Sequence, residues 1–277
     1  MSRYPFTDCL NEYMPLEYGH ISSSTYATTR RKLVQLGKIF HELKQDGRVS
    51  TDNPRKITAK DIDAFVGYRK ANGVVDATIL KDLGILKKML AYFDNDAVSA
   101  FKSKYPAHYP KKYKRRAPAM EESVVDRILA RAMEISEFDW KLSEAYGIVC
   151  LAICTGLRPK ELRMMYVKNV HISGDSAEIL AVHVKGEGPY GTARWIPVHP
   201  DGVPSLKRYL EARTFKLKIS GKTSDALFPP IRGKEEFIGY NMLEKLKKAV
   251  EEDIGESFEL CKCRRTFGQR AFDEGHD

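Results

Sequence analysis

The sequence lacks a long uninterrupted apolar segment, and this absence excludes a membrane span. The longest nearly unbroken apolar run, residues 145–157, is too short to cross a bilayer and contains glycine and threonine. The N-terminus, residues 1–14, carries Asp8, Asn11 and Glu12 among its apolar residues, whereas a secretory signal needs an uninterrupted apolar stretch. We therefore expect a cytoplasmic protein that has no membrane partner.

An even set of cysteines is also missing. The five cysteines are an odd number, which fits reduced intracellular thiols better than a disulfide framework. Cys261 and Cys263 form a C-x-C pair, but no second ligand pair accompanies them, so buried or unreactive thiols explain them better than a zinc site. We expect neither a metal nor another cofactor.

Positive charge is abundant, and much of it lies in one segment. The net charge of +9 would attract a polyanion, because neutralised phosphates release counterions. No acid interrupts residues 102–116, and three tyrosines lie among the basic side chains. These basic residues are Lys102, Lys104, Lys111, Lys112, Lys114, Arg115 and Arg116. The segment predicts packing against a sugar-phosphate backbone; the alternative is a solvated linker whose charge keeps it soluble.

Hydrophobic periodicity predicts a helical first third. Apolar residues recur at helical spacing over residues 25–44, and the capping-box pattern of Thr58 and Asp61 opens a second helix. Asp76 is expected to cap a third helix over residues 77–93, and a further helix is expected near Val98.

The rest of the chain predicts a linker and a mixed domain. Prolines at 106, 110 and 118 exclude a continuous helix through the basic segment, so we expect an extended linker there. Helices are predicted at 121–133, 140–154, 204–213 and 241–252, and strands at 171–184 and 194–198. The predicted organisation is a helical domain over residues 1–103, a basic linker over 104–120 and a mixed α/β domain over 121–277.

Three segments carry residue types suited to phosphate chemistry. The first, residues 155–162, reads TGLRPKEL: Gly156 permits a tight break after a helix, and Pro159 can begin the next one. Arg158 then lies at a helix start, where its guanidinium could grip two phosphate oxygens while Glu161 orients it or caps the helix. The alternative is a structural arginine paired with Glu161.

The second and third segments supply a lysine and another arginine. Residues 184–188 read VKGEG and are followed by WIPV at 195–198, which places Lys185 at a hairpin where its ammonium could protonate a leaving oxygen. A solvated surface lysine is the alternative, and the strand that follows weighs against it. Residues 261–268 read CKCRRTFG and contain Arg264.

Together the three segments resemble the tyrosine recombinase, or phage integrase, family of archaeal or phage type. TGLRPKEL matches the family's TGLRxxEL, the hairpin is similar to the one that carries a catalytic lysine, and CKCRRTF resembles H-x-L-R-[HR]-T-F. The resemblance implies phosphate-binding roles for Arg158 and Arg264, a catalytic role for Lys185 and a supporting role for Glu161. Residues 226–229, ALFP, also resemble a family element of structural role.

Two positions of the third segment depart from the family pattern. Cys261 stands where the family usually has histidine, and Cys263 where it usually has leucine. Cys261, Lys262 or Arg265 could take the acid/base role, and the sequence leaves this choice open. An alternative alignment of this segment would pair Lys262 with Arg265 in a K-x-x-R pattern. Thr266-Phe267 argues against that alignment.

The resemblance implies both a fold and a function. The fold is an α-helical core-binding (SAM-like) N-terminal domain followed by a mixed α/β, mainly helical, catalytic domain with a small β-sheet, the two closing around double-stranded DNA as a clamp. The function is site-specific recombination that integrates or excises a mobile element through a 3'-phosphotyrosine, without a cofactor. Self-association on DNA, as a tetramer in the synaptic complex, and location at the nucleoid are implied as well.

The nucleophile is the part of the pattern that the sequence does not supply. Residues 265–277 contain no tyrosine, so we expect this chain to bind DNA without cleaving it. One alternative is a non-catalytic DNA-binding relic of a recombinase or a split-gene fragment. Another is a relative of type IB topoisomerases, which the helical N-terminal domain and TGLRPKEL disfavour.

Overall fold

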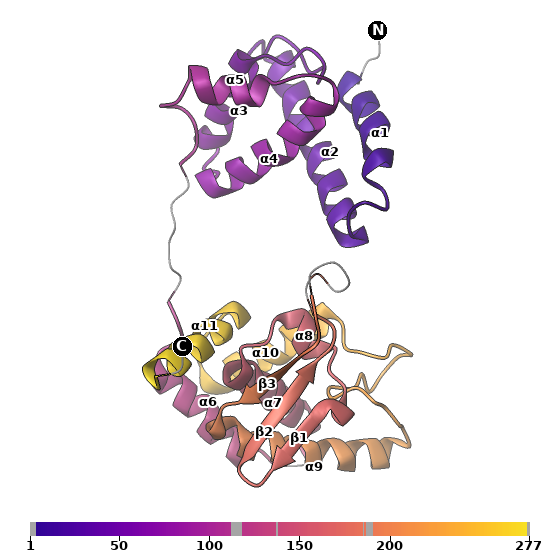
Figure 1. Cartoon of the computed structure of the whole chain (residues 1–277), viewed down its shortest axis with the longest axis vertical. Coiled ribbons are helices and arrows are strands. Elements are labelled where there is room, and N and C mark those ends of the chain that lie inside the picture. Colours follow the sequence, from indigo (N-terminus) through magenta and orange to yellow (C-terminus); the bar gives the residue numbers. More distant parts are fainter. Residues whose placement is uncertain (1–3, 112–117, 137, 185, 187–190, 276–277) are drawn as a thin grey trace. The chain divides into compact units, whose positions relative to one another are not determined.

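The computed structural model describes residues 4–111, 118–136, 138–184, 186 and 191–275 (Figure 1). The chain divides into two compact units, Met1–Arg115 and Arg116–Asp277, and each is described by itself. In these ranges, no helix is both long enough and apolar enough to cross a membrane.

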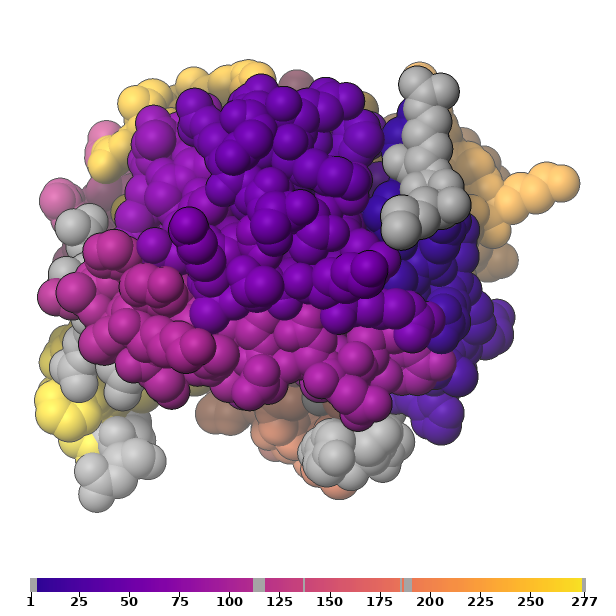
Figure 2. All heavy atoms as spheres, turned by 90° about the horizontal axis from the view of Figure 1, so that it is seen from above, coloured from indigo at the N-terminus to yellow at the C-terminus, as the bar shows by residue number. Residues whose placement is uncertain are grey.

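The first unit is a bundle of helices around an apolar core. Its helices are α1 (Pro5–Glu17), α2 (Ser23–Gln45), α3 (Ala59–Ala71), α4 (Asp76–Tyr92) and α5 (Ala97–Lys104). Helix α2 packs against α1, α3 and α4, and α5 packs against α3 and α4. Phe40, Phe65 and Phe101 are fully buried in the core that these contacts enclose. Figure 2 shows one face of this unit, on which the middle of its sequence lies between α1, in dark blue, and the residues toward 111, in magenta.

The helix predictions for this unit are confirmed except at two places. The capping box is present, since the Asp61 N–H donates to Thr58 Oγ1 at 3.3 Å and the Thr58 N–H donates to Asp61 Oδ2 at 2.9 Å. Asp76, however, does not cap α4: Val75 holds the N-cap position and makes no side-chain hydrogen bond, and Asp76 is the first helical residue. Helix α1 was not predicted, because Pro15 and the polar residues of this segment obscure its apolar stripe.

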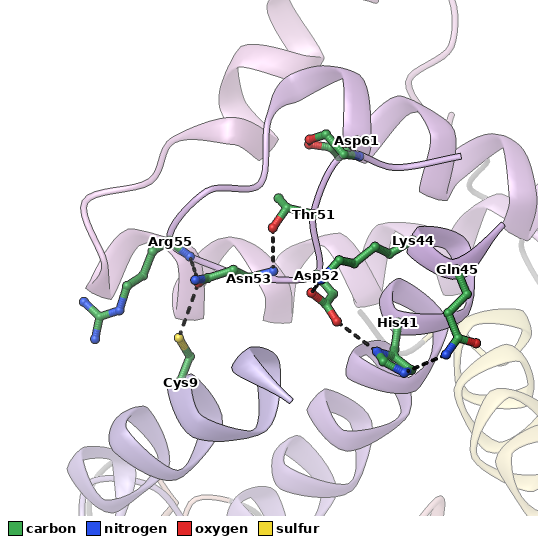
Figure 3. Close-up of polar contacts among 10 residues, drawn as sticks. Cys9, His41, Lys44, Gln45, Thr51, Asp52, Asn53, Arg55 and Asp61 are labelled. Carbon is green, nitrogen blue, oxygen red and sulfur yellow. Dashed lines mark hydrogen bonds and ion pairs between the residues drawn. The ribbon is translucent and has the colours of Figure 1, made fainter. Parts of the chain in front are cut away.

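A buried carboxylate fastens the loop that follows α2. Asp52 is 1% exposed; its Oδ1 accepts a hydrogen bond from Lys44 Nζ at 2.6 Å, and its Oδ2 lies 2.9 Å from His41 Nδ1. Both partners project from the last turns of α2, as Figure 3 shows. Asp61 holds the preceding part of the loop, because its Oδ1 accepts from the Ser50 N–H at 2.6 Å. The loop is therefore tied to helices on both sides.

The described part of the basic segment is folded against the first unit rather than extended. Lys102 and Lys104 belong to the last turn of α5, and Tyr105 and Tyr109 pack against the core. The Lys111 N–H donates to Asp76 Oδ2 at 2.7 Å. The expectation of an extended chain is thus wrong for residues 104–111, because the tyrosines bury ring surface there instead of lying in solvent. Lys112, Lys114, Arg115 and Arg116 lie outside the described residues.

The second unit is built around one buried helix. Its elements are α6 (Glu122–Glu134), α7 (Trp140–Thr155), α8 (Pro159–Arg163), β1 (Val170–Ser173), β2 (Ser176–Ala181), β3 (Arg194–Val198), α9 (Val203–Ser220), α10 (Tyr240–Ile254) and α11 (Leu260–Asp273), with short 3-10 turns at Val167–Asn169 and Pro200–Gly202. Every residue from Ser143 to Thr155 is buried, because α6, α9, α10, α11 and β3 all pack around α7. The prediction that this helix lies deep in a core is confirmed.

The sheet is antiparallel with strand order β1-β2-β3, and Figure 1 shows it lying over α7. The single strand predicted over residues 171–184 is wrong: it is two strands, β1 and β2, because Gly174 adopts a φ of 57° and reverses the chain. Strand β3 pairs Arg194 with Ala181. The ALFP segment is structural, as expected, since Phe228 is fully buried and the Leu227 N–H donates to the Met165 carbonyl at 2.7 Å.

The Asp52 contacts predict a pH-dependent stability of the first unit. Burial would raise the pKa of Asp52, but hydrogen bonds from Lys44 and His41 lower it below its ordinary value. A lowered carboxyl pKa stabilises the fold above the unfolded-state pKa, and this contribution is lost as pH falls through the folded-state pKa. Asp52→Asn should therefore reduce the free energy of unfolding by about 1–3 kcal/mol at pH 7. Urea titrations should show the difference from wild type shrinking at acid pH; a difference that stays constant down to acid pH would contradict this account.

Candidate phosphate-binding site

The site begins at the break between α7 and α8. Gly156 ends α7 with a φ of 61°, a conformation that favours glycine. A Cβ at this position would lie 2.9 Å from Phe267 Cδ1, so the ring of α11 closes over the glycine. The Gly156 carbonyl, left free by the end of α7, accepts a hydrogen bond from Arg264 Nη1 at 2.7 Å. One residue thus brings together segments that are far apart in the sequence.

Glu161 holds Arg158 at the start of α8. Pro159 occupies the first helical turn, and the Arg158 N–H donates to Glu161 Oε2 at 2.8 Å. The Arg158 guanidinium reaches the other oxygen, Oε1, at 3.0 Å. Both roles that the sequence allowed for Glu161, capping the helix and orienting Arg158, are therefore present in the structure.

Arg194 also binds this carboxylate, and the sequence patterns did not predict it. Arg194 Nη2 donates to Glu161 Oε1 at 3.1 Å from the first residue of β3. Burial would raise the pKa of Glu161, but the Arg158 N–H and the Arg194 guanidinium lower it below its ordinary value. The sequence held one indication: Arg194 is in phase with Ile196 and Val198, the buried residues of the strand. An arginine on the inward face of a strand requires a partner.

Helix α11 carries Arg264 and is anchored through its buried face. Cys263 is fully buried with its Sγ 3.9 Å from Met120 Sδ, so cysteine does fill an apolar position here. Thr266 Oγ1 accepts from the Met120 N–H at 2.9 Å. Near its C-terminal end, Arg270 pairs with Glu122 and Asp201. Arg264 is therefore presented from a helix whose rotation is fixed.

The three guanidiniums form a positive cluster that one carboxylate only partly neutralises. Burial lowers the pKa of Arg264, and the positive charges of Arg158 and Arg194 lower it further while Glu161 opposes them. Arginine nevertheless stays protonated, so three positive charges face one negative charge among the described residues of the cluster. The Glu161 side chain is 0% exposed, whereas those of Arg158 and Arg194 are 42% and 38% exposed. The open side of the cluster can accept the oxygens of a phosphate.

The residues proposed for the acid/base role all lie near the start of α11. Cys261 is exposed, and its thiol donates to Glu259 Oε2 at 3.0 Å, an interaction that raises its pKa. Arg265 is exposed on α11, and its positive charge opposes this rise in the pKa of Cys261. Lys262 is half-buried. Because Arg264, not Arg265, reaches Gly156, the geometry fits the register built on Arg264.

The remaining predicted site residues belong to other parts of the chain. Lys185 lies outside the described residues; its neighbour Val184 is buried, and the Gly186 carbonyl accepts from the Gly191 N–H at 2.7 Å. Lys102, Lys104 and Lys111 belong to the first unit. Over the stretches that the structure describes, no group of three or more histidines, cysteines and acids is placed to hold a metal ion.

Comparison with known proteins identifies the fold. No protein-family model and no curated protein matches this sequence. Three similar solved structures are XerH site-specific recombinase bound to its difH substrate, a lambda integrase tetramer bound to a Holliday junction, and the Tn1549 transposon integrase in complex with circular intermediate DNA.

The similarity extends over almost the whole chain. XerH is 16% identical with a TM-score of 0.65, and the match covers 91% of this chain and 71% of that one. Lambda integrase is 17% identical with a TM-score of 0.63, covering 98% and 71%. The Tn1549 integrase is 17% identical with a TM-score of 0.63, covering 99% and 88%. The chain therefore has a mainly helical fold whose small three-stranded sheet matches that of tyrosine recombinase catalytic domains.

Two neighbouring arginines on α11 provide a matched test of the cluster. Sulfate, as a phosphate mimic, should stabilise the wild-type second unit in thermal unfolding. Arg264→Ala should weaken the sulfate affinity by about tenfold, because a charged hydrogen-bond donor is lost. Arg265→Ala removes the same charge one residue away and should change the affinity by less than about twofold. Equal effects of the two substitutions would show that the cluster is not the anion site.

Proposed function

We propose that this protein is a site-specific DNA recombinase of the tyrosine type, in which Arg158, Arg194 and Arg264 hold the phosphate that is cut. The observation that carries the proposal is the three-arginine cluster organised by Glu161. Its support is the fold, which is shared with recombinases whose solved structures contain DNA. The substrate is double-stranded DNA, and the reaction is phosphoryl transfer.

The arginines would act on charge that develops during the reaction. A tyrosine oxygen attacks the phosphorus, a bond from that oxygen to phosphorus forms, and the bond from phosphorus to the 5'-oxygen breaks. Guanidiniums fixed in advance stabilise the additional negative charge of the pentavalent phosphate without reorganising. The phosphodiester energy is retained in a 3'-phosphotyrosine, so strands can be exchanged and resealed without ATP.

The proton for the leaving 5'-oxygen is assigned to Lys185, whose position in the sequence lies between β2 and β3. Cys261 is a poorer candidate for a base than a histidine would be, because its raised pKa keeps the thiol protonated near neutral pH. We propose that it serves as a hydrogen-bond donor, and that Arg265 lies beside the DNA without touching the reacting phosphate.

The attacking hydroxyl is proposed to come from outside the described residues. In the second unit, Tyr146 donates to Asp253 at 2.7 Å and Tyr209 donates to the Leu227 carbonyl at 2.8 Å. Tyr240 is 55% exposed, but hydrogen bonding to Glu244 raises its pKa and makes it a weaker nucleophile. These engaged hydroxyls also favour the second candidate function, a protein that binds DNA without cleaving it.

The first unit and the basic segment are assigned to DNA binding. The first unit is proposed to be the core-binding domain, and Lys102, Lys104, Lys111, Lys112, Lys114, Arg115 and Arg116 are proposed to contact the DNA backbone. Self-association on DNA is proposed because a related fold occurs as a tetramer on a Holliday junction. The protein would act on chromosomal or mobile-element DNA in the cytoplasm.

DNA binding should depend mainly on phosphate contacts, and the preferred DNA site should be symmetric. Affinity for a duplex should fall by about a thousandfold between about 50 and about 200 mM salt, because several counterions are released. Duplexes selected from a random pool should contain inverted half-sites, since two protomers related by a twofold axis read the same sequence. Affinity that is independent of salt would remove the nucleic-acid function, and asymmetric selected sites would contradict the recombinase proposal.

The assignment of the nucleophile has a separate test. When the selected duplex is end-labelled and incubated with residues 1–277, no covalent adduct should form on Tyr146, Tyr166, Tyr209 or Tyr240. A denaturing gel detects any adduct, and peptide mapping locates it. An adduct that maps to Tyr240 and disappears in Tyr240→Phe would show that the attacking group had been wrongly excluded.

A further inference from the structure

The second unit also contains a cavity that is separate from the arginine cluster. It lies between the start of α7, α9, the segment over residues 229–239 and α10, and its volume is about 710 Å³. Neither Glu161 nor any of the three arginines lines it. Volumes of this size are typical of sites for small organic ligands.

An unpaired acid lies at the wall of this cavity. Glu144, on α7, is 2% exposed, and its Oε1 has no hydrogen-bond partner within the part of the chain that the structure describes. Interiors seldom leave a buried polar group unsatisfied, so the position indicates a missing partner. Burial raises the pKa of Glu144 to about 8, against the opposing charge of Lys216. Near neutral pH the group is therefore mainly a neutral acid that can both donate and accept.

The lining of the cavity is partly apolar and partly charged. The walls include Trp140, Phe237, Ile238 and Leu246, whose aromatic and aliphatic surfaces suit a flat ring. Charged residues also border the cavity: the cations are Lys141, Lys216, Arg232 and Lys245, and the acid besides Glu144 is Glu235. This excess of positive charge favours an anionic group on the occupant.

We propose that this cavity binds a nucleoside monophosphate, with an adenine-type base edge on Glu144 and the phosphate among the lysines and Arg232. Adenine presents an amino donor beside a ring-nitrogen acceptor, which a neutral carboxyl group complements by accepting from one and donating to the other. Guanine presents two adjacent donors on its pairing edge and needs a carboxylate instead. The aromatic walls would stack on the base, and the lysines would neutralise the phosphate.

The site can be tested by calorimetric titration of the whole chain with AMP at pH 7. AMP should bind saturably and more tightly than GMP, adenosine or inorganic phosphate. Glu144→Leu should weaken AMP binding at least tenfold, whereas Glu144→Gln, which keeps a donor and an acceptor, should retain it. Lys216→Glu should weaken binding, and the control Lys218→Glu, on the same helix but not lining the cavity, should not. Circular dichroism checks that each variant is folded.

The pH dependence provides a second readout. As pH rises from 7 to above the pKa of Glu144, wild type should lose affinity for AMP because the deprotonated carboxylate cannot donate, while Glu144→Gln should lose much less. The groups around this carboxyl, Lys216 and Tyr209 on α9, Lys141 on α7, Lys245 on α10, and Arg232 and Glu235, are unchanged in the variant, so its titration isolates Glu144. No saturable AMP binding, equal binding of GMP or phosphate, or an unaltered affinity in Glu144→Leu would each overturn the proposal.

Discussion

The buried carboxylate of Glu161 is the interaction on which the candidate site depends. A charge that is wholly removed from water must be paired and hydrogen-bonded, and Glu161 meets this need with the Arg158 N–H and two guanidiniums. The pairing fixes Arg158 at the start of α8 and ties β3 to that helix. One carboxylate cannot neutralise three arginines. The cluster around Glu161 therefore keeps a net positive charge, and the Arg158 and Arg194 side chains expose it to solvent.

The buried helix α7 supplies the rigid support for this arrangement. The close packing around this helix holds the Gly156 turn in place, and Gly147 lets the Tyr209 ring approach so closely that a Cβ there would lie 2.6 Å from it. At its C-terminal end, Gly156 receives both the Phe267 ring and the Arg264 guanidinium. Preorganisation of the arginine cluster thus rests on the packing of α7 against α9 and α11.

Features encoded by neighbouring residues could be predicted from the sequence, and features that depend on distant partners could not. Arg158 and Glu161 are only three residues apart, so the helix-start pattern was sufficient to predict their interaction. The contact of Arg264 with Gly156 spans the domain, and only the family resemblance suggested that these segments meet. Arg194 was missed because its partner lies on another element. The turn at Gly174 was missed because apolar residues lie on both sides of it, and the cap of α4 was assigned to Asp76 instead of Val75 because aspartate is a preferred N-cap residue. The burial of Glu144 follows from tertiary packing, which periodicity does not describe.

We propose that the arginines around Glu161 bind one phosphate of the DNA backbone. A crystal structure of the chain with a duplex obtained by selection tests this most directly. In that complex, the guanidiniums of Arg158, Arg194 and Arg264 should lie within hydrogen-bond distance of a single phosphate while Glu161 remains buried beneath them. A complex in which the DNA is bound but no phosphate reaches these three side chains would contradict it.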